Sequence, residues 1–256
     1  MARIRRAVEN DVPMMTYDYD DDSVVLVIGS GAGGGTMADE LSSHGASVVV
    51  LEAGPRFKES DFTNDEWTMW ERFTWQDKRA VTGTSSIAKN HSDAPTWICK
   101  GVGGTTLHWA GMCPPIRPYE FKTRTTYGAV EGANLADWPL NYEEIEADYI
   151  RAQIKMGVTG RNGMPLSPGS NNYKILALAA RRQGYIDYDT GNLAINSVPA
   201  DGRNACDQIG FCMQGCKSGA KWSTFNSEIP RAEQSGRCEI RSRCMAIRIE
   251  TNQEGK

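Results

Sequence analysis

Near its start the chain carries glycines spaced for nucleotide chemistry. The run Gly29-Ser-Gly31-Ala-Gly33-Gly34-Gly35 contains the spacing Gly29, Gly31, Gly34. The first glycine of such a triplet allows a tight turn, the second lets the backbone approach a pyrophosphate, and the third lets a helix pack closely on a strand. The N–H groups at the start of that helix then face the anion. The pattern predicts a dinucleotide-binding turn.

A βαβ unit is expected to position this turn. Ser23–Ile28 is almost entirely apolar, which is typical of a strand buried on both faces of a parallel sheet. The segment 36–44 can form a helix, and Gly45 is placed to end it. Ser47–Leu51 predicts a second buried strand. Strand, glycine triplet, helix and strand therefore occur in the order that the motif needs.

Glu52 ends the second predicted strand, 23 residues after Gly29. An acidic residue at this place accepts hydrogen bonds from the hydroxyls of an adenosine ribose. The alternatives are a flexible glycine turn without a ligand and a surface carboxylate at Glu52. The motif alone does not separate FAD from NAD.

A second glycine cluster follows at Gly101-Val-Gly103-Gly104-Thr105-Thr106-Leu107-His108. Together with Glu52-Ala-Gly54-Pro55 and Asp137-Trp-Pro-Leu140, it resembles the glucose-methanol-choline family of flavin oxidoreductases over about residues 23–256. The nearest members are bacterial FAD-dependent sugar or polyol dehydrogenases and pyranose oxidase-like proteins. The resemblance implies that Gly103, Gly104 and Thr105 lie along a bound FAD, whereas an ordinary tight turn is the alternative for the cluster alone.

His108 lies four residues after Gly104. A histidine at this place resembles the one that pyranose oxidase and choline oxidase join covalently to the flavin methyl carbon. Such a bond needs a neutral imidazole nitrogen that attacks an oxidised flavin methide. The alternative is a histidine that only packs or hydrogen-bonds beside the cofactor.

Three of the seven cysteines form a cluster, Cys206, Cys212 and Cys216, with the spacing C-x5-C-x3-C. Thiolates suit iron–sulfur clusters or zinc. The segment resembles the three-iron cluster segment of bacterial FAD-dependent glucose dehydrogenases, which would pass electrons from flavin to a cytochrome. Free thiols that pack a loop are the alternative. Zinc is disfavoured because no histidine or fourth cysteine lies in local reach. The other four cysteines are interpreted as core thiols.

The expected fold is α/β, a three-layer Rossmann-like FAD/NAD(P)-binding domain with part of a second, substrate-binding domain. Residues 1–22 are expected to form an N-terminal arm and 23–115 the first segment of the FAD-binding domain. Residues 116–235 are expected to form an inserted region that carries the cysteine cluster, and 236–256 return strands. Within these regions the chain from 56 to about 95 shows no period and is interpreted as a surface excursion.

Helices and strands are also predicted beyond the glycine clusters. Asn141 and Glu144 form a capping-box pattern before a helix that ends at Gly157. A further helix is expected over about 172–183. The apolar alternation predicts strands at 239–241 and 245–250.

The family resemblance implies an FAD-dependent oxidoreductase that takes a hydride from a CH–OH group of a sugar, polyol or other alcohol. The family's catalytic histidine lies near the C-terminus of a chain about twice this length, so the sequence is expected to be an N-terminal fragment without it. Three alternatives stay open: a non-catalytic flavin-binding remnant, a nicotinamide-dependent dehydrogenase, and an electron-transfer module centred on the cysteines.

Composition limits the partners. The formal net charge is -4 and no dense basic run occurs, which disfavours nucleic acid. No segment approaches the roughly 18 apolar residues of a membrane span, and the start lacks the apolar core of a signal peptide. A cytoplasmic location is expected, or a periplasmic one after export with a small partner subunit.

Overall fold

The computed structural model describes residue 17 and residues 21–73 and 98–250. Within it the chain divides into two compact units. The first comprises Met1–Ala110, Phe211–Lys217 and Ser223–Lys256, and the second comprises Gly111–Gly210 and Ser218–Trp222. The predicted domain boundaries after residues 22, 115 and 235 stay predictions.

A parallel sheet forms the centre of the first unit. Its strands are β1 (Val24–Ile28), β2 (Ser47–Leu51) and β3 (Cys238–Arg241), in the order β1-β2-β3. Ile28 pairs with Leu51, and Leu51 with Arg241, so the carboxyl ends of the strands meet at one edge. Helix α1 (Ala32–Ser43) connects β1 to β2. The predicted α/β fold with a βαβ unit is confirmed.

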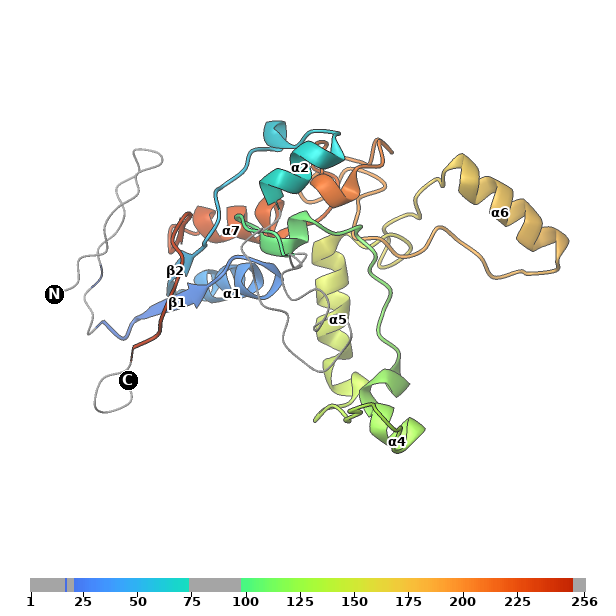
Figure 1. Ribbon diagram of the computed structural model, residues 1–256, viewed down its shortest axis with the longest axis horizontal. Helices are drawn as coiled ribbons and strands as arrows, with labels where there is room; N and C mark the ends of the chain where they lie inside the picture. Colours follow the sequence, from blue (N-terminus) through green and yellow to red (C-terminus); the bar gives the residue numbers. More distant parts are fainter. Residues whose placement is uncertain (1–16, 18–20, 74–97, 251–256) are drawn as a thin grey trace. The chain divides into compact units, whose positions relative to one another are not determined.

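Helices α1 and α7 (Glu228–Gln234) cover one face of this sheet (Figure 1). Ala38 of α1 and Ala232 of α7 pack on Val48 and Val50 of β2, and all four are fully buried. The small alanine side chains let the helix backbones approach the strand closely. The described residues thus show the sheet and one helical layer, while the third layer of the predicted fold stays a prediction.

The strand β1 does not have the environment that its composition predicts. Leu26 and Ile28 are 57% and 52% exposed, because β1 is an edge strand of the described sheet and α1 and α7 cover the opposite face. The strand predicted at 245–250 is wrong as well, since residues 242–250 form no helix or strand. Ile247 there is 90% exposed. Alternating apolar residues form a strand only where another strand offers its backbone hydrogen bonds.

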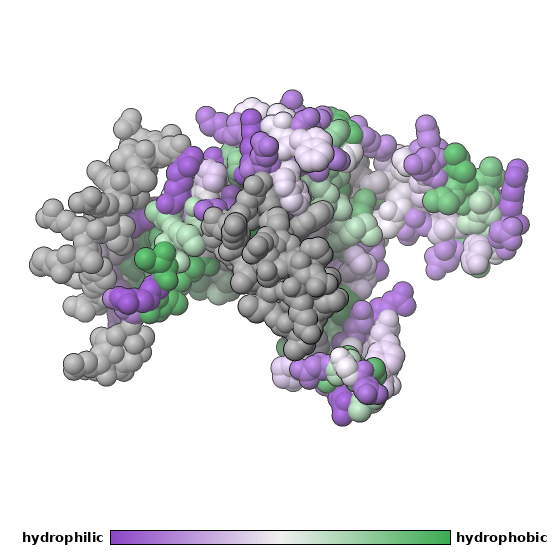
Figure 2. Space-filling model, viewed as in Figure 1, coloured by the Kyte–Doolittle hydropathy of each residue, from purple (hydrophilic) through white to green (hydrophobic). Residues whose placement is uncertain are grey.

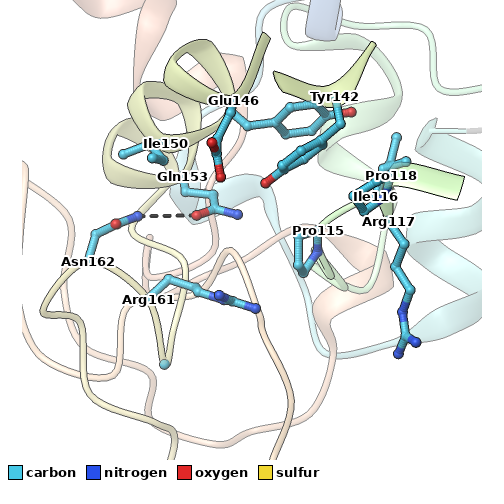
Figure 3. Close-up of a pocket in the computed structure, with 12 residues that line it drawn as sticks. Pro115, Ile116, Arg117, Pro118, Tyr142, Glu146, Ile150, Gln153, Arg161 and Asn162 are labelled. Carbon is cyan, nitrogen blue, oxygen red and sulfur yellow. Dashed lines mark hydrogen bonds between the residues drawn. The ribbon is translucent and has the colours of Figure 1, made fainter. Parts of the chain in front are cut away.

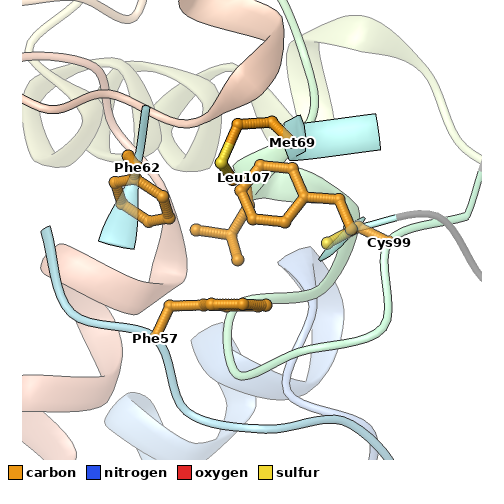
Figure 4. Close-up of a cluster of buried hydrophobic side chains, with 6 residues drawn as sticks. Phe57, Phe62, Met69, Cys99 and Leu107 are labelled. Carbon is orange, nitrogen blue, oxygen red and sulfur yellow. The ribbon is translucent and has the colours of Figure 1, made fainter. Parts of the chain in front are cut away.

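A second hydrophobic core lies in the first unit beside the sheet. Its buried members are Phe57, Phe62, Met69, Phe73, Cys99 and Leu107 (Figure 4). Helix α2 (Glu66–Phe73) supplies Met69 and Phe73, which lie one turn apart on the same helix face. The interpretation of this stretch as an irregular surface excursion is therefore wrong for residues 57–73. Residues 74–97 of that prediction lie outside the described part.

The second unit contains two longer helices at the predicted places. Helix α5 (Tyr142–Met156) begins with the capping box of Asn141 and Glu144, and Gly157 ends it with a φ of 64°. Helix α6 (Asn171–Arg182) has Ser170 as its N-cap, and the Ser170 side chain accepts a hydrogen bond from the Tyr173 N–H. Its Ile175 and Leu176 are 67% and 69% exposed, and Figure 2 shows this hydrophobic surface.

Short elements complete the described chain. They are η1 (Glu59–Asp61), η2 (Gly104–Leu107), η3 (Pro118–Lys122), α4 (Thr123–Tyr127), η4 (Cys212–Gln214) and η5 (Thr224–Asn226). No helix among the described residues has the length and apolar character to cross a membrane.

The thiol of Cys238 makes the stability of the first unit depend on pH. Burial, and next the charge of Glu233, raise its pKa to about 11. An unfolded thiol ionises near pH 8.5, so between that pH and about 11 the folded chain retains a proton that the unfolded chain has lost. The Cys238 contribution to stability is present below this window and disappears as the pH rises through it.

We expect wild type to lose more stability than Cys238→Ala when the pH rises from about 8 to about 10.5, a window set by the two thiol pKa values. Urea unfolding of both chains at the two pH values measures this difference. The measurement at the lower pH also separates the packing loss in the variant from the proton effect. Equal alkaline losses in both chains would contradict the prediction.

Candidate functional site: two glycine turns and a buried carboxylate

The first glycine turn lies at the carboxyl edge of the sheet, directly after β1. Gly29 has a φ of 89°, and its N–H donates to the Leu51 carbonyl oxygen over 2.8 Å. Helix α1 starts at Ala32 after Gly31, which has no side chain to cap it. The N–H groups in the first turn of a helix lack partners in the helix itself. They are therefore available to an anion in front of the turn.

Gly34 holds α1 close to β1. A Cβ built at Gly34 overlaps the carbonyl oxygen of Gly29 and lies 3.1 Å from Cγ1 of Val27. By contrast, a Cβ at Gly33 meets nothing within 4 Å. The close packing that the motif assigns to the third glycine of the triplet is thus a property of Gly34, whereas Gly33 faces open space.

The second glycine cluster touches the first, although about 70 residues separate them. Gly103 and Gly104 have φ values of 104° and 55°, and a Cβ on Gly104 would lie only 2.6 Å from the Cα of Gly31. Next to them, the Thr105 carbonyl oxygen accepts a hydrogen bond from the His108 N–H, and its hydroxyl oxygen accepts one from the Cys99 N–H. The structure therefore brings Gly31 of the first glycine turn and Gly104 of the second to one place.

Glu52 lies beside this place and is only 6% exposed. Its Oε2 accepts hydrogen bonds from the Ser30 N–H over 3.1 Å and from the Ser30 hydroxyl over 2.6 Å. Its Oε1 accepts one from the Gly54 N–H over 2.8 Å. An ionised carboxylate offers roughly four acceptor positions, so capacity for one more donor remains. Glu52 is therefore held by three hydrogen bonds and retains one acceptor position.

His108 is buried against aromatic rings in the same unit, with 8% exposure. Its ring centroid lies 6.2 Å from that of Trp70 and 6.4 Å from that of Phe73. Nδ1 lies 2.5 Å from the carbonyl oxygen of Met213. Because a carbonyl only accepts, Nδ1 is the donor in this contact, and the tautomer that matches it has the lone pair on Nε2. This is the tautomer in which Nε2 can act as a nucleophile.

The three clustered cysteines fall into different units. Cys206 belongs to the second unit, where its N–H donates to the Asn196 carbonyl oxygen. Cys212 and Cys216 belong to the first unit, where Cys212 begins η4 and Cys216 follows its last residue by two positions. All three are half-buried and none forms a disulfide bond. In the described part of the chain, no three His, Cys, Asp or Glu side chains gather as a metal site. The cluster stays a prediction.

The second unit contains a cavity of about 510 Å³ along α5 (Figure 3). The rings of Tyr142 and Tyr149 stack there at 5.9 Å, and burial, followed by the Tyr142 hydroxyl, raises the pKa of Tyr149. Asn162 donates to Oε1 of the buried Gln153 over 3.2 Å. Sequence analysis did not single out these residues, although Tyr142 and Tyr149 lie two helical turns apart on one face.

Sequence analysis also missed three buried hydroxyl residues between the glycine turns: Ser30, Thr106 and Thr224. Ser30 lies inside the glycine triplet, so its position in the motif could have identified it. Thr224 has no local signal. It lies 194 positions after Ser30 in the sequence, and only the fold brings the two residues together.

Comparison with known proteins gives relatives of one kind. No family model matches the chain. The fructose dehydrogenase large subunit of Gluconobacter japonicus is 29% identical over 247 residues, which cover 83% of this chain and 43% of that protein. The 2-methyl-1,2-propanediol dehydrogenase of Mycolicibacterium austroafricanum is 28% identical over 246 residues, covering 90% of this chain and 44% of that protein.

The gluconate 2-dehydrogenase flavoprotein of Pantoea cypripedii is 26% identical over 274 residues, covering 88% of this chain and 44% of that protein. The chain thus spans less than half the length of these curated relatives. The resemblance that the motifs predict is confirmed: this chain is similar to the N-terminal part of the glucose-methanol-choline oxidoreductases.

Proposed function

We propose that the first unit binds FAD and that the chain is the flavin-holding part of an oxidoreductase acting on CH–OH groups. The observation that carries the proposal is the meeting of Gly31 and Gly104 beside the buried Glu52, at the carboxyl edge of a parallel sheet. Open α/β sheets bind nucleotides outside this edge. The three relatives are named as dehydrogenases, and one of them is named as a flavoprotein.

The residues present fit the cofactor. The first turn of α1 offers N–H groups to a pyrophosphate, and the glycines there leave room for its oxygens. Glu52 retains an acceptor position for a ribose hydroxyl. Gly103, Gly104 and Thr105 then continue the site toward His108, whose N–H donates to the Thr105 carbonyl oxygen. Each of these assignments is part of the proposal.

When bound, FAD supplies the hydride acceptor for oxidation of an alcohol. The substrate class that the relatives favour is a sugar, polyol or other alcohol. A base must take the hydroxyl proton of that substrate. His44 does not suit this task, since its Nδ1 lies 2.7 Å from the Glu40 carbonyl oxygen of its own helix. His91 lies outside the described residues. As the family resemblance implies, we assign the base to a part of the relatives' length that this chain does not span.

Electron transfer is the less supported part of the proposal. Cys206, Cys212 and Cys216 would hold a three-iron cluster that passes electrons to a cytochrome, and a small subunit would accompany export. One relative is named as a large subunit, so that protein has partners. Loop-packing thiols are the competing function of these cysteines.

Absorbance of the purified chain before and after acid precipitation tests both FAD binding and its attachment. We expect a flavin spectrum, and yellow colour that stays with the wild-type pellet but moves to the supernatant in His108→Asn, because we propose Nε2 of His108 as the nucleophile while Nδ1 donates to Met213. Iron and acid-labile sulfide measured on the same sample test the cluster.

Colour that leaves the wild-type pellet would contradict covalent attachment and leave FAD binding standing. A colourless chain that also takes up no added FAD would contradict the proposed function itself. His44→Asn is the matched control, because this exposed histidine binds only its own helix, and it should leave the spectrum unchanged.

A further inference from the structure

Ser30 is the point at which the two glycine turns and Glu52 are joined. It is fully buried and lies between Gly29 and Gly31. Its hydroxyl donates to Glu52 Oε2 over 2.6 Å and accepts from the Gly103 N–H over 3.0 Å. One oxygen atom therefore contacts both the carboxylate and the second glycine turn.

The backbone of Ser30 extends these contacts. Its N–H donates to the same carboxylate oxygen of Glu52, and its carbonyl oxygen accepts from the Thr224 hydroxyl over 2.8 Å. The Thr224 N–H in turn donates to the Thr106 hydroxyl oxygen, and that hydroxyl donates to the Gly103 carbonyl oxygen over 2.5 Å. Both threonines are buried, with exposures of 0% and 7%. Gly103 is thus held through its N–H and its carbonyl by one network.

We propose that Ser30 is a positioning residue that couples the ribose end of the cofactor site to the Gly103–Gly104 turn. The inference rests on the proposed FAD binding. A ribose hydroxyl on Glu52 restrains that carboxylate, the carboxylate directs the Ser30 hydroxyl, and the hydroxyl fixes the Gly103 N–H. A ligand that binds beside the Gly103–Gly104 turn then meets a turn that is already ordered, and it loses less conformational entropy on binding.

Substitution of Ser30 breaks this chain of contacts at one atom. Ser30→Ala removes the hydroxyl donor of Glu52 and the acceptor of the buried Gly103 N–H. Unsatisfied buried donors are costly, so the second turn is expected to relax. Ser30→Cys retains a side chain of similar size but replaces the hydroxyl by a weak donor and acceptor. It therefore removes the coupling without leaving a cavity.

The coupling is measured in the His108→Asn background, from which FAD that is not covalently bound can be removed, with the two halves of the cofactor as separate ligands; wild type below means this background with Ser30 in place. ADP supplies the adenosine and pyrophosphate, and riboflavin supplies the isoalloxazine ring without a competing phosphate. In wild type we expect the riboflavin Kd to fall about fivefold or more when ADP is saturating, the scale typical of coupled sites. Riboflavin fluorescence follows this directly.

Variants separate coupling from stability. Ser30→Ala and Ser30→Cys should make the riboflavin Kd independent of ADP, whereas Glu52→Gln should weaken ADP binding itself. Ser42→Ala is the matched control, because Ser42 is also a buried serine and its hydroxyl donates to the Asp39 carbonyl oxygen of its own helix. It should keep the wild-type coupling even if it unfolds at lower urea.

The outcomes are distinct. A wild-type riboflavin Kd that ADP does not change would overturn the role of Ser30, and this measurement needs no variant to fold. Coupling that survives in a folded Ser30→Cys would overturn it too. A wild type that binds neither FAD nor ADP nor riboflavin would overturn the proposed function and the inference together. Coupling present in wild type and Ser42→Ala but absent in the Ser30 variants supports it.

Discussion

Replacing Gly34 by alanine is expected to abolish FAD binding and to lower the free energy of unfolding by about 3 kcal/mol or more, the upper range for overpacking. The added Cβ overlaps the Gly29 carbonyl oxygen, which is backbone and cannot rotate away as a side chain can. Helix α1 must therefore move away from β1. The N–H groups of α1 that we propose to bind the pyrophosphate move with it.

Gly33→Ala provides the matched control for this prediction. Gly33 lies one residue away in the same helical turn, but its Cβ would meet nothing within 4 Å. Alanine is also favoured over glycine in a helix by roughly 0.5 to 1 kcal/mol. We expect Gly33→Ala to match or exceed wild type in urea unfolding and to bind FAD normally. Equal losses of stability and FAD binding in both variants would contradict the prediction, because they would show that any side chain in this turn is harmful, whether or not it overlaps the Gly29 carbonyl oxygen.

Replacing Arg231 by leucine is expected to destabilise the first unit by about 3 to 5 kcal/mol, the cost of leaving buried charges without their partner. Nε of Arg231 lies 3.1 Å from Asp39 Oδ2, and Nη2 lies 3.2 Å from Glu228 Oε1. The two carboxylate side chains are only 7% and 3% exposed. Without the guanidinium, both are left close together and poorly solvated.

A second arginine offers the control for this ion-pair network. Arg56 forms an ion pair with Glu233, another residue of α7, but both side chains are about one third exposed. Exposed pairs contribute roughly 0 to 1 kcal/mol. Urea unfolding of Arg56→Leu should therefore stay close to wild type. A small effect of Arg231→Leu, comparable to that of Arg56→Leu, would contradict the view that the pair between α1 and α7 stabilises the sheet's helical layer.

The same network has a bearing on the cofactor site. Asp39 lies on α1, whose first turn we propose to bind the pyrophosphate, and Glu228 begins α7 with one residue between it and η5, which supplies Thr224. Arg231 thus ties together the helix that presents N–H groups and the segment that contacts Ser30. Loss of this ion pair is therefore expected to weaken FAD binding in addition to stability.

Local patterns in the sequence were sufficient to predict the βαβ unit. The strands at 24–28, 47–51 and 238–241, helix α1, and helix α5 with its capping box all follow from short-range signals. Apolar runs, a glycine triplet and a cap act over a few residues, so their outcome does not depend on distant parts of the chain. The candidate residues of the first glycine turn and Glu52 came from the same signals.

Short-range patterns failed where an element needs a partner. The alternation at 245–250 is typical of a strand, yet the described residues supply no strand to pair with it. Helix α2 was missed for the opposite reason. Its short sequence shows no clear period, and the core formed with Phe57, Phe62 and Leu107 stabilises it.

The two glycine turns, the acidic residue after β2 and the helix that begins at the first turn could be predicted from the sequence, because each depends on the conformation of a few neighbouring residues. Only the tertiary structure brought Gly104 against Gly31, and only it placed Thr224 on the backbone of Ser30. Contacts between segments 70 to about 190 residues apart depend on how the sheet and its helices pack. The packing of the whole unit, and no local pattern, thus decided that one buried serine hydroxyl joins Glu52 to the second turn.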